Sequence, residues 1–208
     1  MLIDKSVIEF LNETASDSPA PGGGSVAALA GSLAASLGVM VCNLTLGKEK
    51  YSDVEDEIKE ISSKLQVNMK RLNELIDEDA NAFNDVMEAF KMPKDSEEQK
   101  TIRSDAIQKG YKKAISVPIE TARYSLECLG FINTLVKKGN QNAITDAGTG
   151  ALMALSGVRG AIYNIKINLT SIKDQDYVKN IKNEVNNIDN SALEFYRKIN
   201  SEVEEVFE

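Results

Sequence analysis

The chain has 208 residues, 42% of them hydrophobic and 27% charged, which suits one globular domain spanning residues 1–208. The formal net charge of −8 argues against nonspecific binding to nucleic acid or to an anionic membrane surface. Histidine is absent, which removes the commonest general base, the commonest metal ligand and every Ser–His or Cys–His catalytic pair. An enzyme with this sequence would move protons with carboxylate, lysine, tyrosine or amide groups, and we expect no metal site.

The first residues carry charges where a signal peptide needs its apolar region, so we expect no secretion signal. Cys42 and Cys128 lie in apolar stretches, which is typical of buried thiols in a protein core. Both observations favour a cytoplasmic protein.

The hydrophobic pattern predicts helices in chain order, starting with a short amphipathic helix over about 5–11 with Asp4 as its N-cap. A loop rich in Ser, Pro and Gly follows at 13–24, and then a helix of small residues over about 25–46. The next apolar positions step by threes and fours over 53–92, which predicts one long helix.

Asp95 and Glu98 are spaced as a capping box for the following helix, in which Pro118 predicts a kink or break. A second small-residue helix is expected over about 143–169, and Asp174 or Asp176 should open a terminal amphipathic helix. No strand-like alternation is sustained anywhere. The sequence therefore predicts an all-α, single-domain helical bundle with one long helix and two small-residue central helices.

The first small-residue helix has no charge for 22 positions, which is long enough to cross a bilayer. Its polar residues Ser25, Ser32, Ser36 and Asn43, however, fall within about 40° of one another on a helical wheel. Such a stripe suits a helix buried in protein, where neighbours or a ligand satisfy the hydroxyl groups. We therefore favour an interior helix over a membrane span.

The glycines before this helix, Gly22 to Gly24, formally match the start of a dinucleotide-binding fingerprint. That fingerprint needs a preceding strand, which the proline-containing loop cannot form, and a Walker-A loop needs a Lys-Ser/Thr pair that is missing. Two interpretations stay open. The exposed N–H groups at a helix start can bind a carboxylate, a carbonyl oxygen or developing negative charge, or the glycines simply allow a tight entry into a crowded helix.

On the long helix, Asp79 lies on the flank of the apolar stripe centred on Ile76, whereas Asp77 and Asp85 should face outward. The rest of this stripe consists of Leu72, Phe83, Met87 and Phe90. A carboxylate beside a packed seam loses hydration, which raises its pKa and allows it to shuttle protons near neutral pH. The alternative is a carboxylate paired with a nearby lysine or arginine.

The second small-residue helix also carries a polar face, opposite the side from which Arg159 and Lys166 project. This face holds Asn142, Asp146, Gly150, Gly157, Asn164 and Asn168. It predicts either a hydrogen-bonded helix contact or the wall of a pocket. Lys48 and Lys50 follow the first small-residue helix. Their positive charges either stabilise the negative end of its dipole or bind the anionic tail of a ligand.

Five stretches together resemble the cyclodeaminase/cyclohydrolase family of folate enzymes, over nearly the whole chain and in the same order. This family includes the cyclodeaminase half of formiminotransferase-cyclodeaminase and stand-alone bacterial methenyltetrahydrofolate cyclohydrolases. The stretches are PAPGGGSVAAL, MVCNLTLGKEKY, LIDEDANAFNDVMEAFKMPK, AISVPIETA and GNQNAITDAG with NIKINL.

The resemblance implies an all-helical subunit that forms a homodimer, with a folate cleft at or near the interface. It implies a reduced folate as substrate, including polyglutamylated forms, and no permanently bound cofactor or metal. The family's catalytic carboxylate is the second Asp of D-x-D-A-x-A-F, which here is Asp79. Asp77, Asn43, Lys48 and Asp146 also match family motifs. No formiminotransferase half is present, which favours a stand-alone one-carbon enzyme.

We therefore predict a methenyltetrahydrofolate cyclohydrolase, in which Asp79 takes a proton from water and returns one to the departing N5. The alternatives are a formiminotetrahydrofolate cyclodeaminase, which releases ammonia, and a non-catalytic helical scaffold. We expect glycine N–H groups to face the pterin or reacting carbon, and the lysines to meet the glutamate tail. The predicted substrate-binding residues are Gly22, Gly23, Gly24, Ser25, Asn43, Lys48, Lys50, Asp77, Asn142 and Asp146.

Overall fold

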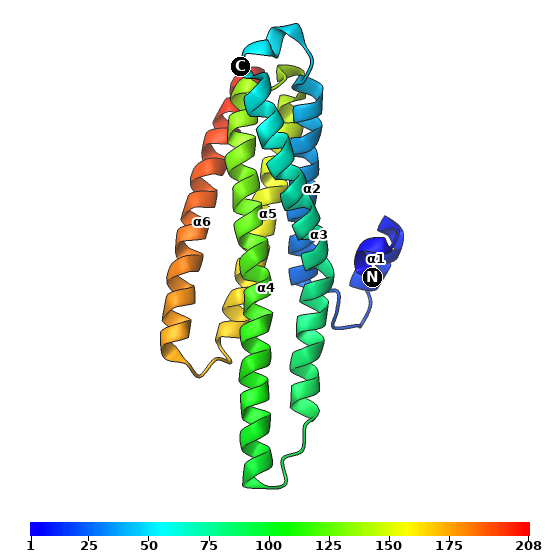
Figure 1. Cartoon of the computed structure of the whole chain (residues 1–208), viewed down its shortest axis with the longest axis vertical. Helices are drawn as coiled ribbons and strands as arrows, with labels where there is room; N and C mark the ends of the chain where they lie inside the picture. Colours follow the sequence, from blue (N-terminus) through cyan, green and yellow to red (C-terminus); the bar gives the residue numbers. More distant parts are fainter.

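The computed structural model describes residues 1–208 and confirms an all-helical fold without strands (Figure 1). Short 3₁₀ turns lie at Leu2–Asp4, Glu49–Val54, Gln141–Ala143 and Glu205–Phe207. The α-helices are α1 Val7–Thr14, α2 Gly23–Thr45, α3 Glu55–Lys91, α4 Glu97–Lys138, α5 Ile144–Leu169 and α6 Gln175–Glu204.

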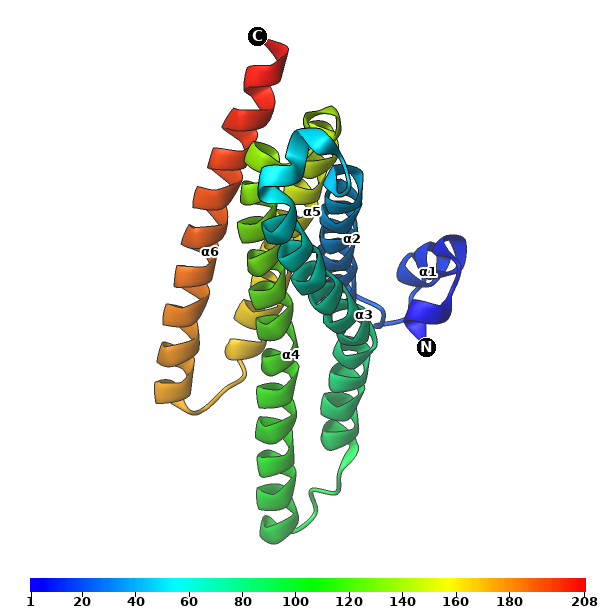
Figure 2. The ribbon, with the colours of Figure 1, turned by 45° about the horizontal axis from the view of Figure 1, so that its top comes forward.

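Helices α2, α3, α4 and α5 form the central bundle, and α6 packs mainly on α4 and α5. On the opposite side, α1 stands apart from the bundle beside α2 and α3 (Figures 1 and 2). The hairpin of α3 and α4 extends well beyond the ends of α2, α5 and α6. This projecting hairpin, together with the start of α2 and the end of α5, creates the corner in which the candidate site lies.

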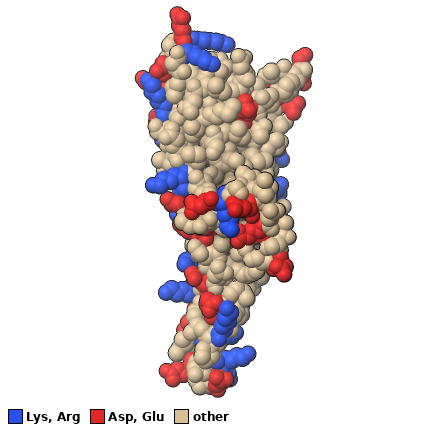
Figure 3. Space-filling view, turned by 90° about the vertical axis from the view of Figure 1, so that its right-hand side faces the viewer, with Lys and Arg blue, Asp and Glu red and all other residues tan.

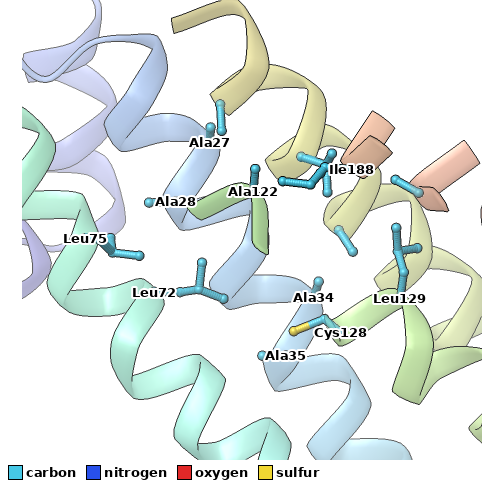
Figure 4. Packing of buried hydrophobic residues seen from close by; sticks show 14 of the residues in the cluster. Ala27, Ala28, Ala34, Ala35, Leu72, Leu75, Ala122, Cys128, Leu129 and Ile188 are labelled. Carbon is cyan, nitrogen blue, oxygen red and sulfur yellow. The ribbon is translucent and has the colours of Figure 1, made fainter. Parts of the chain in front are cut away.

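Small residues let the central helices approach closely, and the apolar core runs between them as a cluster of 41 buried residues. Ala28, Ala34 and Ala35 of α2 lie near side chains of α3 and α4 (Figure 4), while Ala27 lies against Gly160 of α5. A Cβ atom at Gly31 would lie 2.4 Å from Ser125 Oγ on α4. Similarly, a Cβ at Gly157 of α5 would lie 3.0 Å from the Gly31 nitrogen. The two small-residue helices are therefore central, as predicted.

Helix α2 is long and apolar enough to cross a membrane by length and composition. In the bundle, 56% of its most apolar window is buried against protein. This burial agrees with the interpretation of α2 as an interior helix.

Two predicted N-caps are wrong by a residue or two. Ser6, rather than Asp4, caps α1 in a capping box with Glu9. Ser96, rather than Asp95, caps α4 in a capping box with Gln99. Both observed boxes have a hydroxyl at the N-cap and a Glu or Gln three residues later, so that each side chain reaches the other's backbone N–H.

Pro118 does not break α4, which runs without interruption from Glu97 to Lys138 and is longer than α3. Proline has no N–H for the carbonyl four residues earlier, which here belongs to Ala114. The side-chain amide of Asn168 on α5 donates to that carbonyl at 2.9 Å. A hydrogen bond from a neighbouring helix thus satisfies the group that the proline leaves free, and the bundle contains two long helices instead of one.

The apolar stripe of α3 is only partly buried, which corrects the wheel-based expectation. Leu72 and Ile76 are fully buried, but Phe83, Met87 and Phe90 are 37%, 42% and 41% exposed. These three residues lie on the last turns of α3, beyond the stretch that meets the start of α2 at Asp79. Their apolar surface instead lines the candidate site.

Candidate active site

A cleft of about 330 Å³ lies where the start of α2 and the end of α5 meet the projecting hairpin. Apolar groups form the larger part of its lining, and polar groups form a substantial part as well. It is lined by Pro19, Ala20, Gly22, Gly23, Gly24, Asp79, Ala80, Phe83, Val86, Met87, Phe90, Tyr111, Ala114, Asn164, Ile167 and Asn168.

Asp79 lies in this cleft, half-buried against the first turn of α2. A Cβ atom at Gly24 would lie 2.1 Å from Asp79 Oδ1, so only glycine leaves room for the carboxylate there. The next residue, Ser25, is fully buried, and its hydroxyl oxygen lies 3.1 Å from Asp79 Oδ2. The glycine-rich start of α2 and the catalytic candidate on α3 are therefore parts of one site.

Burial raises the pKa of Asp79, while hydrogen bonding from the Ser25 side chain and backbone opposes this shift. The Ser25 hydroxyl has one proton but two acceptors, since Oγ also lies 2.9 Å from the Ile76 carbonyl oxygen. When it donates to Ile76, its lone pair can accept from a protonated Asp79. When Asp79 is ionised, the hydroxyl can donate to the carboxylate instead. Ser25 therefore accommodates both protonation states.

The first N–H groups of α2 are available to a ligand. Gly22 is the N-cap and makes no side-chain capping bond, so the amides of Gly23 and Gly24 have no helical partner. They border the cleft together with Asp79. The arrangement offers hydrogen-bond donors and a proton carrier within the same corner.

Aromatic and thioether side chains form the outer wall of the cleft. Phe83, Met87 and Phe90 follow one another along α3, and Tyr111 of α4 meets Phe90 edge to face, with ring centroids 6.3 Å apart. On the facing side, α5 contributes the amides of Asn164 and Asn168. A flat, largely apolar molecule with a polar edge would fit these two walls.

The sequence of the chain matches a family model described as formiminotransferase-cyclodeaminase over residues 6–187. The chain belongs to this family. A methenyltetrahydrofolate cyclohydrolase of Methylorubrum extorquens is 37% identical over 176 residues, which is 85% of each chain. A crystal structure of a formiminotetrahydrofolate cyclodeaminase from Thermotoga maritima has a TM-score of 0.91 and 28% identity, with 100% of both chains covered.

Larger family members match only in part. The formimidoyltransferase-cyclodeaminase of Mus musculus is 33% identical over 173 residues, which cover 83% of this chain but 32% of that protein. That of Dictyostelium discoideum is 35% identical over 198 residues and 36% of its length. This chain therefore spans about a third of those relatives, and it is comparable in extent with the bacterial cyclohydrolase.

The family motifs separate into two groups in the subunit. Gly22, Gly23, Gly24 and Asp79 line the cleft, and Ser25 lies beneath it, bound to Asp79 rather than open to a ligand. The remaining predicted residues are outside the cleft.

Asn43, Lys48, Lys50, Asn142 and Asp146 lie at the other end of the bundle. There the Asn140 side chain donates to the Leu44 carbonyl at 2.9 Å, which joins the end of α2 to the start of α5. Gly24 and Asn43 are separated by about 28 Å along α2, at 1.5 Å per residue. Within one subunit these residues therefore lie far from the part of a ligand that Asp79 touches.

Asp77 has a separate structural partner. Its carboxylate accepts hydrogen bonds from the Leu2 and Ile3 N–H groups at 2.6 and 3.3 Å, and so holds the amino-terminal segment on α3. The wheel placed it outside the apolar seam, and it lies there, half-buried under this segment.

Sequence reasoning missed several lining residues. Phe83, Met87 and Phe90 are apolar residues at helical spacing, and this pattern is the same whether the residues pack in a core or line a cleft. Asn164 and Asn168 were visible as amides on a polar face, but the sequence could not separate a packing contact from a pocket. In the structure Asn168 does both, since it lines the cleft and binds the Ala114 carbonyl. Tyr111 had no signal at all.

Proposed function

We propose that this folate one-carbon enzyme is a methenyltetrahydrofolate cyclohydrolase, which converts 5,10-methenyltetrahydrofolate and water to 10-formyltetrahydrofolate. The observation that carries the proposal is the half-buried Asp79 beside the unpaired N–H groups of α2, at the inner end of an aromatic cleft. The name and matching extent of the Methylorubrum extorquens relative support this reaction.

In the first step, water adds to the methenyl carbon of the bridge between N5 and N10. Asp79, as the carboxylate, takes one proton from this water, and a neutral carbinol forms from the cationic bridge. The N–H groups of Gly23 and Gly24 are placed to donate to the new oxygen or to the pterin. General-base help of this kind is worth about 10² to 10⁴ in rate.

In the second step, the bond from the carbon to N5 breaks. Protonated Asp79 gives its proton to N5, and the carbinol O–H loses a proton as the formyl C=O forms on N10. That last proton leaves to solvent through Asp79, so that one proton is released in each turnover. Ser25 can follow each change, because its hydroxyl reaches both Asp79 and the Ile76 carbonyl.

The cleft also suggests how the folate lies. With the reacting carbon at Asp79, the p-aminobenzoyl ring would extend along Phe83, Met87 and Phe90, which follow Asp79 on α3. Asn164 and Asn168 would face its polar edge. The reaction needs no bound cofactor or metal, and we propose a cytoplasmic enzyme that takes free reduced folates.

A homodimer would bring the two groups of family motifs together, the cleft residues of one copy and the residues at the opposite bundle end of the other. Large apolar side chains are exposed along α2 and α5: Val26, Leu33, Met40, Leu44, Leu152, Tyr163 and Ile167. Figure 3 shows a wide area with few charges on the upper part of the side seen there. Leu33 lies midway between Gly24 and Asn43 along α2. A two-fold axis near Leu33 would therefore bring the Asn43 end of a second copy to the cleft.

In such a dimer, the segment with Lys48 and Lys50 from the second copy would lie beyond the end of α2, beside the projecting hairpin. That position suits the glutamate tail of a folate whose reacting carbon is at Asp79. Both lysine side chains are exposed, so their ammonium groups are accessible to an anionic ligand. The proposed dimer thus gives the predicted residues one shared site.

The decisive experiment follows the absorbance of 5,10-methenyltetrahydrofolate. The wild-type chain should consume it above the spontaneous rate, and Asp79→Asn should lower kcat by about 10² to 10⁴. Asp85→Asn is the matched control, because Asp85 is exposed on the same helix and pairs with Lys113 at 2.6 Å. Turnover by Asp79→Asn close to that of the wild type would refute the role of Asp79.

The second candidate is formiminotetrahydrofolate cyclodeaminase activity, favoured by the structural match to the Thermotoga maritima protein over the full chain. Here N10 would attack the N5-formimino carbon, and Asp79 would carry the N10 proton to the departing ammonia. The same assay separates the two reactions, because cyclodeaminase activity makes methenyl absorbance appear from 5-formiminotetrahydrofolate. Absence of both activities would favour a non-catalytic scaffold.

A further inference from the structure

The Asp79 carboxylate has no positively charged partner within the subunit. Its only side-chain hydrogen-bond partner is the neutral Ser25 hydroxyl, and the only other titratable group lining the cleft is Tyr111. Helix α2, which covers Asp79 from one side, contains no charged residue. A half-buried carboxylate that meets only neutral donors is incompletely compensated, because the hydrogen bonds from the Ser25 hydroxyl and backbone replace only part of the hydration that burial removes.

The charged groups on the other neighbouring elements either pair with other residues or lie outside the cleft. On α4, Lys112 pairs with Asp174 at 2.8 Å and Lys113 with Asp85 at 2.6 Å. On α3 itself, Arg71 binds Glu78 at 2.6 Å.

On α5, Arg159 pairs with Asp189 at 3.4 Å, while Lys166 is exposed and lines no part of the cleft. Arg103 donates to the Phe90 carbonyl at 3.0 Å, and Phe90 is about 16 Å from Asp79 along α3. The loop before α2 adds Asp17, which is exposed. In the proposed dimer, the partner subunit's Asp146 would lie near this end and its Lys48 further along the tail.

Folate one-carbon units differ in charge at the atoms that would face Asp79. The 5,10-methenyl bridge carries a positive charge shared by N5 and N10, and a 5-formimino group is a protonated amidine. The 5-formyl group is a neutral amide of nearly the same shape as the 5-formimino group, and the 10-formyl group is neutral as well. Shape therefore separates the two N5-substituted ligands poorly, whereas a carboxylate without a cationic partner separates charged from neutral one-carbon units.

We propose that the cleft selects its folate by the positive charge of the one-carbon unit, which serves as the counter-ion that Asp79 lacks. This inference rests on the proposed function and extends it to ligand discrimination. The cation holds Asp79 ionised, with the Ser25 hydroxyl turned toward it. Once the bridge opens to a neutral formyl group and the last proton has left through Asp79, the ion pair is lost and the carboxylate again has no counter-ion. The neutral product then binds more weakly than the substrate, which favours its release.

The test uses two inert planar probes that differ in charge but hardly in shape, benzamidine and benzamide. Dissociation constants are measured by ligand-observed NMR on the full-length chain at pH 8. Benzamidine should bind at least tenfold more tightly than benzamide, which corresponds to about 1.4 kcal/mol. Asp79→Asn should abolish the preference, and Asp85→Asn should keep it. Equal binding of the probes to the wild-type chain would overturn the proposal, and so would a preference that survives in Asp79→Asn.

Two further measurements keep the test decisive if Asp79→Asn folds poorly. In the wild-type chain, the preference for benzamidine should decline as the pH falls and Asp79 takes up a proton. In Ser25→Ala, which removes the hydroxyl from the carboxylate, this decline should occur at higher pH. The range from about pH 4 to about pH 8 covers the titration of a carboxyl group with a raised pKa. A preference for benzamidine that stays constant over this range would contradict the proposal.

The proposed reaction can fail separately. If the chain hydrolyses methenyltetrahydrofolate but binds both probes equally, the charge-selection inference is wrong and the reaction stands. If it shows no turnover but prefers benzamidine through Asp79, the cleft selects cations and the proposed reaction is wrong. As a folate-level check, neutral 5-formyltetrahydrofolate should bind Asp79→Asn at least as tightly as the wild type.

Discussion

Asp79 shows how a functional residue can lower the stability of the protein that carries it. The carboxylate lies against the glycine start of α2, where burial raises its pKa. A raised carboxyl pKa means that the folded protein holds this proton more tightly than the unfolded chain. As the pH rises from the ordinary pKa of 3.8 through the higher folded value, the folded state therefore loses stability relative to the unfolded state.

We predict that Asp79→Asn unfolds at a higher temperature than the wild type at pH 8, and that this gain disappears near pH 4. Asparagine has the same shape but never carries the uncompensated charge. Melting temperatures from circular dichroism at both pH values would test this. A constant offset between the two proteins at both pH values would contradict the assignment of the shift to burial of Asp79.

Gly24→Ala should abolish most activity while the bundle still folds. The added Cβ would lie 2.1 Å from Asp79 Oδ1, so the carboxylate must move out of its position. Because small misplacements of reacting groups are costly, we expect kcat to fall by about 10²-fold. Gly130→Ala is the matched control, since its Cβ would meet only Phe195 Cζ at 3.8 Å, far from the cleft. Full activity in Gly24→Ala would refute the requirement for the Asp79 carboxylate at this position.

At the scale of the helices, α2 packs through close contacts between small residues rather than through large side chains. The Ser125 hydroxyl lies at the point where α2, α4 and α5 meet, buried and without a hydrogen-bond partner. It therefore fills space at a junction too narrow for larger side chains at Gly31 or Gly157. The same closeness allows Asn168 to reach the carbonyl that Pro118 frees, which keeps α4 in one piece.

Gly31→Ala should destabilise the protein by about 1–3 kcal/mol, because its Cβ would lie 2.4 Å from Ser125 Oγ. Combining it with Ser125→Ala should recover part of this loss, since the second change removes the clashing atom. Ser125→Ala alone should be close to neutral, because the hydroxyl has no partner to lose. Urea denaturation of the four proteins in a double-mutant cycle would measure the coupling. Strictly additive effects would rule out this contact as the cause.

At the scale of the whole molecule, the subunit separates its family motifs between two ends of one bundle. The exposed apolar face of α2 and α5 lies between those ends. A single subunit would leave this face in water and leave Lys48 and Asp146 without a ligand. Association through this face would account for both features at once.

Leu33→Asp should therefore convert a dimer to a monomer and reduce turnover, as measured by light scattering after size-exclusion chromatography and by the methenyl assay. Val67→Asp is the control, because Val67 is 64% exposed on α3, away from this face. A dimeric Leu33→Asp protein would refute the proposed interface.

Subunit mixing tests the shared site itself. Asp79→Asn and Lys48→Ala homodimers should each be impaired. Their randomly mixed dimers should regain activity, on the order of a quarter of the wild-type sites, if one site draws on both chains. No recovery on mixing would mean that Lys48 does not complete the partner's cleft.

The sequence by itself determined the helical class, the approximate helix bounds, the central place of the small-residue helices and Asp79 as an unusual carboxylate. These features depend on local periodicity and local chemistry, which a single helix expresses. Only the tertiary structure decided that Phe83, Met87 and Phe90 line a cleft, because burial depends on whether a neighbour covers that stretch of α3. Likewise, only the meeting of α2 with α3 placed Gly24 and Ser25 against Asp79, over 50 residues away in the chain. Helix packing, rather than any local pattern, joined the glycine loop and the carboxylate into one site.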